Sequence, residues 1–274
     1  MKKFFLILIF VYNCFYAQQD TVVSKFNWVN IGIGVNYTET DNNGMDIFIG
    51  FGGWSVKQEW ANNWCSNLYF EKLNYLGIKY IYSVKGPDTP CYAEKEIDNL
   101  KLAKNLLFLL KNQQGPNTNR IIVAAHSSGA FVAHQLFQIL YGNQKLDSLN
   151  ITSPKIIYFN LDGGIGGGDC GFEINQVIAD KLAKIYAVYA YDDSIKIYSP
   201  NYDDMVLLGS MFNPKSESIE INVSGCGCSA KWCVHDALIN RAPFKPASFD
   251  LKNDYNNINQ THPVQTDYLD LLIK

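Results

Sequence analysis

Strand-like and helix-like patterns of apolar residues alternate along most of the chain. Short runs rich in β-branched and aromatic residues are typical of buried strands, and between them apolar residues recur at helical spacing. The runs that we expect to form strands cover residues 26–37 (an early strand or a hairpin), 45–49, 78–84, 121–123, 156–161, 185–190 and 218–223. The helical segments cover 62–76, 94–112, 131–140 and 173–184. This alternation predicts an α/β fold with a mostly parallel central sheet and helices on both faces.

The junction between one strand and the next helix carries the most distinctive pattern. The apolar run 121–123 leads into residues 125–129, Ala-His-Ser-Ser-Gly, and a helical pattern follows. A sharp strand-to-helix turn lifts a serine hydroxyl out of the sheet, and only very small residues fit two positions before and after it. The pattern therefore predicts that Ser127 is a nucleophile and that the N–H of Ser128 faces a developing oxyanion.

This segment resembles the Gly-x-Ser-x-Gly motif of the α/β-hydrolase family, with Ala125 in place of the first glycine. The resemblance implies the α/β-hydrolase fold and a catalytic triad in the chain order nucleophile, acid, histidine. Residues 50–54, Gly-Phe-Gly-Gly-Trp, resemble the glycine-rich loop that supplies a second oxyanion donor in this family. We therefore expect the N–H of Gly53 or Trp54 to complete an oxyanion hole.

Two of the four histidines are candidates for the general base that a serine nucleophile needs. His235 follows the last predicted strand, where the resemblance places the base, and His262 lies farther along the chain. We expect the side chain of His126 to point away from Ser127 into neighbouring packing, and His134 to be an ordinary helix residue. The sequence thus favours His235, with His262 as the alternative.

Three aspartates are candidates for the carboxylate that orients the base. Asp192 ends the strand before the last one, at the edge where ligands of open α/β sheets lie, and Asp193 is its neighbour. Asp162 ends the preceding strand, from which some members of the family take their acid. The sequence favours Asp192, then Asp162, then Asp193.

The first residues predict export. Lys2 and Lys3 precede a short apolar run, and the pattern up to Ala17 is typical of a secretory signal peptide. We expect residues 1–17 to be removed and residues 18–274 to form a single α/β-hydrolase domain, secreted or periplasmic. The formal net charge of −3 becomes more negative without the two lysines, which argues against nucleic acid or an anionic membrane as partner.

Six cysteines remain after the signal peptide, and an even number in an exported chain predicts disulfides. Their pairing cannot be read from the sequence, although Cys65 with Cys91 is one candidate pair. The order Cys226, Cys228, Cys233, His235 could also suggest zinc, but the spacing is not standard and exported thiols tend to oxidise. The six are Cys65, Cys91, Cys170, Cys226, Cys228 and Cys233.

Together these features predict an exported serine hydrolase that cleaves a small-molecule or polymeric carboxylic ester through an acyl-enzyme on Ser127. No metal or organic cofactor is expected. The glycine-rich residues 163–171 follow a strand, but they lie mid-chain and are expected to border the active site, not to bind a dinucleotide. Amide or peptide hydrolysis by the same triad, and a non-catalytic binding protein on the same scaffold, are the alternatives.

Overall fold

The computed structural model describes residues 26–90, 96–112, 120–141, 155–167, 171–224, 228, 230–239 and 263–272. The expected signal peptide lies outside the described residues. So do His262 and the cysteines Cys91, Cys170 and Cys226.

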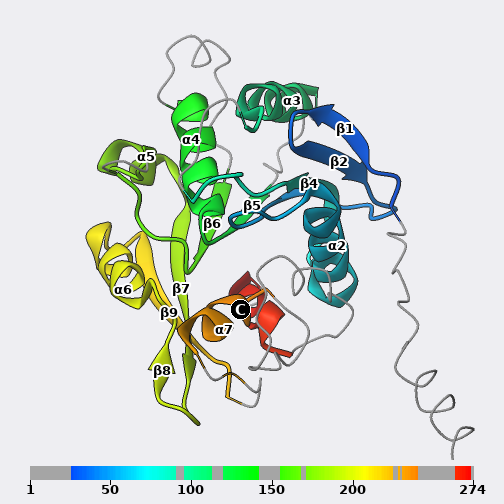
Figure 1. The fold of residues 1–274 in the computed structure, drawn as a ribbon. Helices are drawn as coiled ribbons and strands as arrows, with labels where there is room; N and C mark the ends of the chain where they lie inside the picture. Colours follow the sequence, from blue (N-terminus) through cyan, green and yellow to red (C-terminus); the bar gives the residue numbers. More distant parts are fainter. Residues whose placement is uncertain are drawn as a thin grey trace, which may run out of the picture.

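The described chain forms one nine-stranded sheet, in the spatial order β1-β2-β4-β3-β5-β6-β7-β8, with β9 paired to β7 (Figure 1). Strands β4, β3, β5, β6, β7 and β9 run parallel to one another, whereas the hairpin β1–β2 and the short β8 pair antiparallel. The strands are β1 (Val29–Gly32), β2 (Val35–Glu39), β3 (Asp46–Phe51), β4 (Ile78–Val84), β5 (Arg120–His126), β6 (Lys155–Leu161), β7 (Lys184–Asp192), β8 (Ile197–Tyr198) and β9 (Ser216–Asn222).

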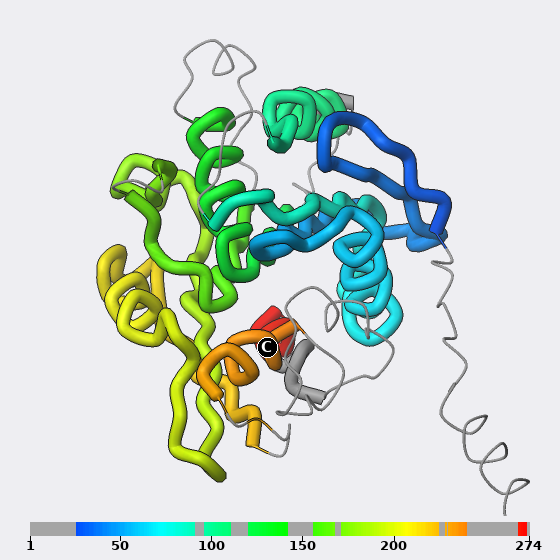
Figure 2. Tube along the Cα trace, viewed as in Figure 1, coloured from blue at the N-terminus to red at the C-terminus, as the bar shows by residue number. Residues whose placement is uncertain are grey.

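Helices cover both faces of this sheet, and each face has its own apolar core (Figure 2). One core includes Leu106 of α3 and Leu136 of α4. The other includes Trp64 of α2, Val234 of α7 and Tyr268 of η6. The helices are α2 (Gln58–Leu68), the π-helical turn η1 (Tyr69–Leu73), α3 (Asn99–Asn112), α4 (Gly129–Tyr141), α5 (Gln176–Lys181), α6 (Tyr202–Met211), α7 (Lys231–Asp236) and the 3₁₀ helix η6 (Pro263–Leu272).

The predicted fold class is confirmed, and so are the predicted strands to within a few residues. The inner strand β5 is buried from Ile121 to His126, as expected of a parallel strand covered on both faces. The sequence pattern missed α6, β8, α7 and η6. Helix α6 exposes Val206, Leu207 and Met211 to solvent, which blurs the one-sided apolar pattern of a surface helix.

Among the described helices, we find none that combines the length and the apolar character needed to cross a bilayer.

His134 of α4 is buried in the core with both ring nitrogens engaged. Its Nδ1–H donates to the carbonyl oxygen of Phe172 at 3.2 Å, and its Nε2 accepts from the Tyr158 hydroxyl at 3.0 Å. Burial lowers the pKa of His134 to about 4, despite the opposing effect of the bond to Phe172. His134 is therefore a structural histidine that is neutral in the folded protein.

The lowered pKa predicts a loss of stability in acid. Between pH 6.5, the ordinary value, and pH 4, the unfolded chain binds a proton at His134 that the folded protein does not. The free energy of unfolding should therefore fall with decreasing pH across this window, by up to ~3 kcal/mol from this residue. Urea unfolding of His134→Gln should show a shallower fall between pH 7 and pH 4.5. A pH dependence equal to that of the wild type would contradict the assignment.

Candidate active site

Ser127 lies in a strained turn between β5 and α4. Its φ angle is 53°, in the left-handed region that residues other than glycine seldom adopt. Its N–H donates to the Leu161 carbonyl at 3.1 Å, and its own carbonyl accepts from the Ala130 N–H at 3.0 Å. These bonds tie the turn to β6 on one side and to α4 on the other. The geometry is that of a nucleophile elbow, with a half-buried serine at its tip.

Glycines are needed where the loop after β3 approaches this turn. A Cβ atom at Gly129 would come within 2.4 Å of the Gly52 carbonyl oxygen, and one at Gly53 would come within 2.9 Å of the Ser127 Cβ. The backbone of residues 52–53 therefore packs directly against the elbow. This close approach leaves no room for a side chain at Gly53 or Gly129.

Three backbone N–H groups of the elbow and of the loop that packs against it are left open. Within the described part of the chain, no hydrogen bond uses the N–H of Gly53, Trp54 or Ser128. By contrast, the N–H of Gly52 donates to the Val84 carbonyl at 3.0 Å. Backbone donors normally find a partner, so these unused N–H groups are candidates for binding an oxyanion.

His235 of α7 pairs with Asp162, the residue that follows β6. Its Nδ1 lies 2.5 Å from the Oδ2 atom of Asp162, and both side chains are buried. The other carboxylate oxygen of Asp162 accepts a hydrogen bond from the Ser199 hydroxyl at 2.8 Å. Asp162 is thus held on both oxygens, and its bond to Nδ1 leaves the Nε2 atom of His235 as the nitrogen that can take a proton.

The backbone around Asp162 is equally constrained. Its φ angle is 50°, its N–H donates to the Val188 carbonyl at 2.8 Å, and its carbonyl accepts from the Asn201 side chain at 2.6 Å. A left-handed residue turns the chain sharply at the end of the strand. This turn is what directs the carboxylate of Asp162 toward His235.

The sequence favoured Asp192 as the partner of His235, and the structure corrects this order. Strand β7 continues through Asp192, whose Oδ1 accepts from both the N–H (2.9 Å) and the hydroxyl (2.5 Å) of Ser194. Its Oδ2 has no partner among the described residues. Asp193 is exposed and pairs with Lys196. Both aspartates therefore serve the local turn into β8, and Asp162 alone of the three contacts His235.

The surroundings of His235 favour its protonated form. Burial lowers the pKa of His235, but the hydrogen bond and charge of Asp162, together with the charge of Asp236, outweigh burial and raise it above the ordinary 6.5. Such a residue accepts a proton readily when it is needed. Trp232 packs edge-on against the ring, with centroids 5.5 Å apart.

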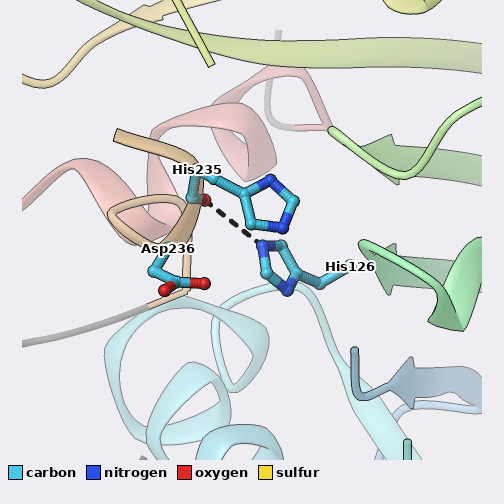
Figure 3. Close-up of side chains that lie close together, drawn as sticks. All are labelled: His126, His235 and Asp236. Carbon is cyan, nitrogen blue, oxygen red and sulfur yellow. Dashed lines mark hydrogen bonds between the residues drawn. The ribbon is translucent and has the colours of Figure 1, made fainter. Parts of the chain in front are cut away.

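His126 lies beside His235. The two ring centroids are 4.3 Å apart, and the Nε2 of His126 is 3.2 Å from the backbone carbonyl oxygen of His235 (Figure 3). Burial, and secondarily the neighbouring His235, lower the pKa of His126 well below its ordinary value. His126 is thus packed in the interior, as expected. It also contacts the candidate base His235, which the sequence did not predict.

No hydrogen bond joins the Ser127 hydroxyl to His235 among the described residues. Ser127 is nevertheless close to the pair, because its N–H bonds the carbonyl of Leu161, the residue before Asp162, and its chain neighbour His126 contacts the backbone of His235. Hydrogen bonds between a nucleophile and its base are often long before substrate binds. The structure therefore gathers Ser127, His235 and Asp162 at one edge of the sheet.

His126, His235 and Asp236 carry donor atoms within 4.8 Å of one another and form the one group of potential metal ligands in the described residues. One nitrogen of each ring is already engaged. The Nδ1 of His235 is bound to Asp162, and the Nε2 of His126 faces a carbonyl oxygen and so carries a proton. The hydrogen bonds thus account for one nitrogen of each histidine without an ion.

Comparisons of the sequence alone find no relatives: no protein-family model matches, and no curated protein matches. Solved structures do match. Carboxyl esterase 2 from the mycorrhizal fungus Tuber melanosporum superposes with a TM-score of 0.54, at 10% identity, over 94% of this chain and 87% of that one. A hyperthermophilic esterase from the archaeon Pyrobaculum calidifontis covers 86% of this chain and 83% of its own, with a TM-score of 0.49 and 12% identity.

The likeness to the Tuber melanosporum enzyme covers most of both chains. The chain has the α/β-hydrolase fold. At such low identity the match shows the fold alone, so the activity must be argued from the site itself.

The predicted disulfides are found only in part among the described cysteines. Cys228 and Cys233 form a disulfide with Cα atoms 5.4 Å apart, just before His235. Sulfurs that are bonded to each other are not zinc ligands, which further weakens the zinc interpretation. Cys65 is free and buried on α2, with its Sγ 3.9 Å from the Tyr82 carbonyl oxygen. The suggested pair of Cys65 with Cys91 is therefore wrong, because the thiol faces the sheet.

The glycine-rich segment after β6 borders the elbow, as expected, over its described residues. A Cβ atom at Gly163 would come within 2.6 Å of the Ser127 carbonyl oxygen. Asn160 closes this turn, since its side chain accepts from the Gly163 N–H and donates to the Gly164 carbonyl. Sequence reasoning missed Ser199 and Asn201, which hold Asp162. No local pattern marks them, because their partner lies more than thirty residues earlier.

The pairing of His235 with Asp162 makes a spectroscopic prediction. In Asp162→Asn the pKa of the His235 ring should fall, because burial then acts with only Asp236 to oppose it. In the matched variant Asp192→Asn it should stay unchanged. Titration of the ring protons by NMR measures both. A fall in Asp192→Asn, with none in Asp162→Asn, would return the role to Asp192.

Proposed function

We propose that this protein is an exported serine hydrolase that cleaves carboxylic esters through an acyl-enzyme on Ser127. The observation that carries the proposal is the buried pair of His235 and Asp162 at the same sheet edge as a strained serine flanked by open N–H groups. This arrangement supplies a nucleophile, a base, an orienting carboxylate and an oxyanion site. The esterases that share the fold agree with this choice by analogy.

In the first half of the reaction, Ser127 Oγ attacks the ester carbonyl carbon and its proton passes to His235 Nε2. Asp162 holds the opposite nitrogen and stabilises the imidazolium. The N–H groups of Ser128 and of Gly53 or Trp54 bind the oxyanion of the tetrahedral intermediate. The intermediate then collapses, and the departing alkoxide takes the proton from His235 and leaves as the alcohol.

In the second half, a water molecule repeats the attack on the acyl-enzyme. His235 removes its proton, the same N–H groups bind the second oxyanion, and the bond to Ser127 breaks. The proton returns from His235 to the serine oxygen, and the carboxylic acid is released. All of these steps are carried by side chains and backbone groups of this chain.

We propose further that residues 1–17 direct export and that residues 18–274 are the mature single-domain enzyme. The two N-terminal lysines, the apolar run after them and the disulfide of Cys228 and Cys233 support this, since disulfides persist in oxidising compartments.

A fluorophosphonate probe and a short-chain aryl ester test the proposal. Wild type should be labelled and should hydrolyse the ester. Ser127→Ala should lose labelling, and kcat should fall roughly 10⁴-fold or more in Ser127→Ala and His235→Ala. The matched variants His262→Ala and Asp192→Asn should keep wild-type turnover, whereas Asp162→Asn should not.

Other outcomes would redirect the proposal. No labelling and no turnover in folded wild type would favour a non-catalytic binding protein. Faster cleavage of a matched anilide than of the ester would make the enzyme an amide hydrolase. Loss of activity in His262→Ala, with none in His235→Ala, would reassign the base.

The pH dependence of kcat/KM follows from the raised pKa of His235. The base works only when it is neutral, so activity should rise with pH through the pKa of His235 in the free enzyme. Because Asp162 and Asp236 raise that pKa, the midpoint should lie above 6.5. An acid limb with its midpoint below 6.5 would contradict this electrostatic assignment.

A further inference from the structure

His126 occupies a position from which it touches two parts of the site. It ends β5 directly before Ser127, and it is fully buried. Its Nε2 reaches the backbone carbonyl oxygen of His235 at 3.2 Å, across 109 residues of sequence. Its Nδ1 faces the loop after β3, where a Cβ at Gly53 would lie 3.0 Å away.

The hydrogen bond fixes the tautomer of His126. A carbonyl oxygen only accepts, so the proton must be on Nε2 and the lone pair on Nδ1. That Nδ1 has no partner among the described residues. An unpaired buried polar atom costs stability, and an apolar side chain of similar size would avoid the cost. Packing alone therefore does not account for a histidine here, whereas the bond to His235 does.

The charge state of His126 also suits a neighbour of the base. The ring is neutral because burial and the nearby His235 both disfavour its protonated form. A charged ring at 4.3 Å would oppose the imidazolium that His235 becomes during catalysis. The groups that face His235 are then Asp162 and Asp236, which carry negative charge, and neutral His126.

We propose that His126 is a positioning residue, which uses its Nε2–H to hold the main chain of His235 against the nucleophile elbow. The inference rests on the proposed function, in which His235 is the base. His126 does not take part in proton transfer. It sets the distance between the ring of His235 and Ser127, because it is the last residue of β5 and its ring is bonded to a backbone carbonyl of α7.

The matched variants His126→Gln and His126→Met test this role. Glutamine keeps a donor near the position of Nε2, and methionine fills a similar volume without one. Loss of the bond should lower kcat roughly 10- to 100-fold in His126→Met with little change in KM, as expected from misplacement of a base. His126→Gln should retain most of the activity.

The pH profile separates positioning from simple destabilisation. Without the bond, the His235 ring should pair less firmly with Asp162, and the acid limb of kcat/KM should move to lower pH in His126→Met but not in His126→Gln. Equal losses in both variants, with unshifted acid limbs, would show that His126 only fills space and would overturn the inference.

Two measurements remain decisive if His126→Met fails to fold or if the protein proves not to be an esterase. In wild type, NMR should show a slowly exchanging His126 Nε2 proton. In His126→Gln compared with wild type, the titration of the His235 ring should be preserved. A rapidly exchanging proton would refute the hydrogen bond itself, independently of turnover. Absent turnover with a protected proton would instead refute the proposed function and leave the contact intact.

Discussion

Close packing of backbone at the turn after β5 is the constraint on which the rest of the site depends. Ser127 has a left-handed backbone, which is costly unless its surroundings enforce it. The loop after β3 packs against this turn, where Gly52 lies close to Gly129. Gly163, after β6, also packs against the turn, close to the Ser127 carbonyl. The half-buried serine thereby lies at the same edge of the sheet as Asp162 and the loop with the proposed oxyanion donors. One crowded turn thus positions three separate segments.

The sequence predicted what local patterns encode. Buried parallel strands such as β5 read as continuous apolar runs, and the requirement for small residues around Ser127 leaves a readable motif. The choice between Asp162 and Asp192 was not encoded in this way. Both end neighbouring parallel strands, so both lie at the correct edge, and the choice depends on one backbone angle. Asp162 has a φ of 50° and turns toward α7, whereas Asp192 continues β7 and is taken by Ser194.

The features that the sequence missed depend on contacts between distant segments. Helix α7 has six residues, too few to show a periodic pattern, and its stability comes from packing Val234 into the core. Ser199, which directly follows β8, donates a hydrogen bond to Asp162. In the sequence it looks like an ordinary turn serine. His126 looked like ordinary packing beside a nucleophile, because its partner is a backbone carbonyl that no side-chain pattern marks.

A short helix is an unexpected support for the candidate base His235, because isolated short helices fray. The structure holds His235 by several independent means. The disulfide of Cys228 and Cys233 closes the segment in front of it, and the buried Leu238 anchors the segment behind it. Asp162 binds the ring, and the His126 ring contacts the backbone carbonyl. Each contact restricts a different motion of α7, and together they hold the ring with Nδ1 on Asp162, so that Nε2 is the nitrogen left for the proposed proton transfer.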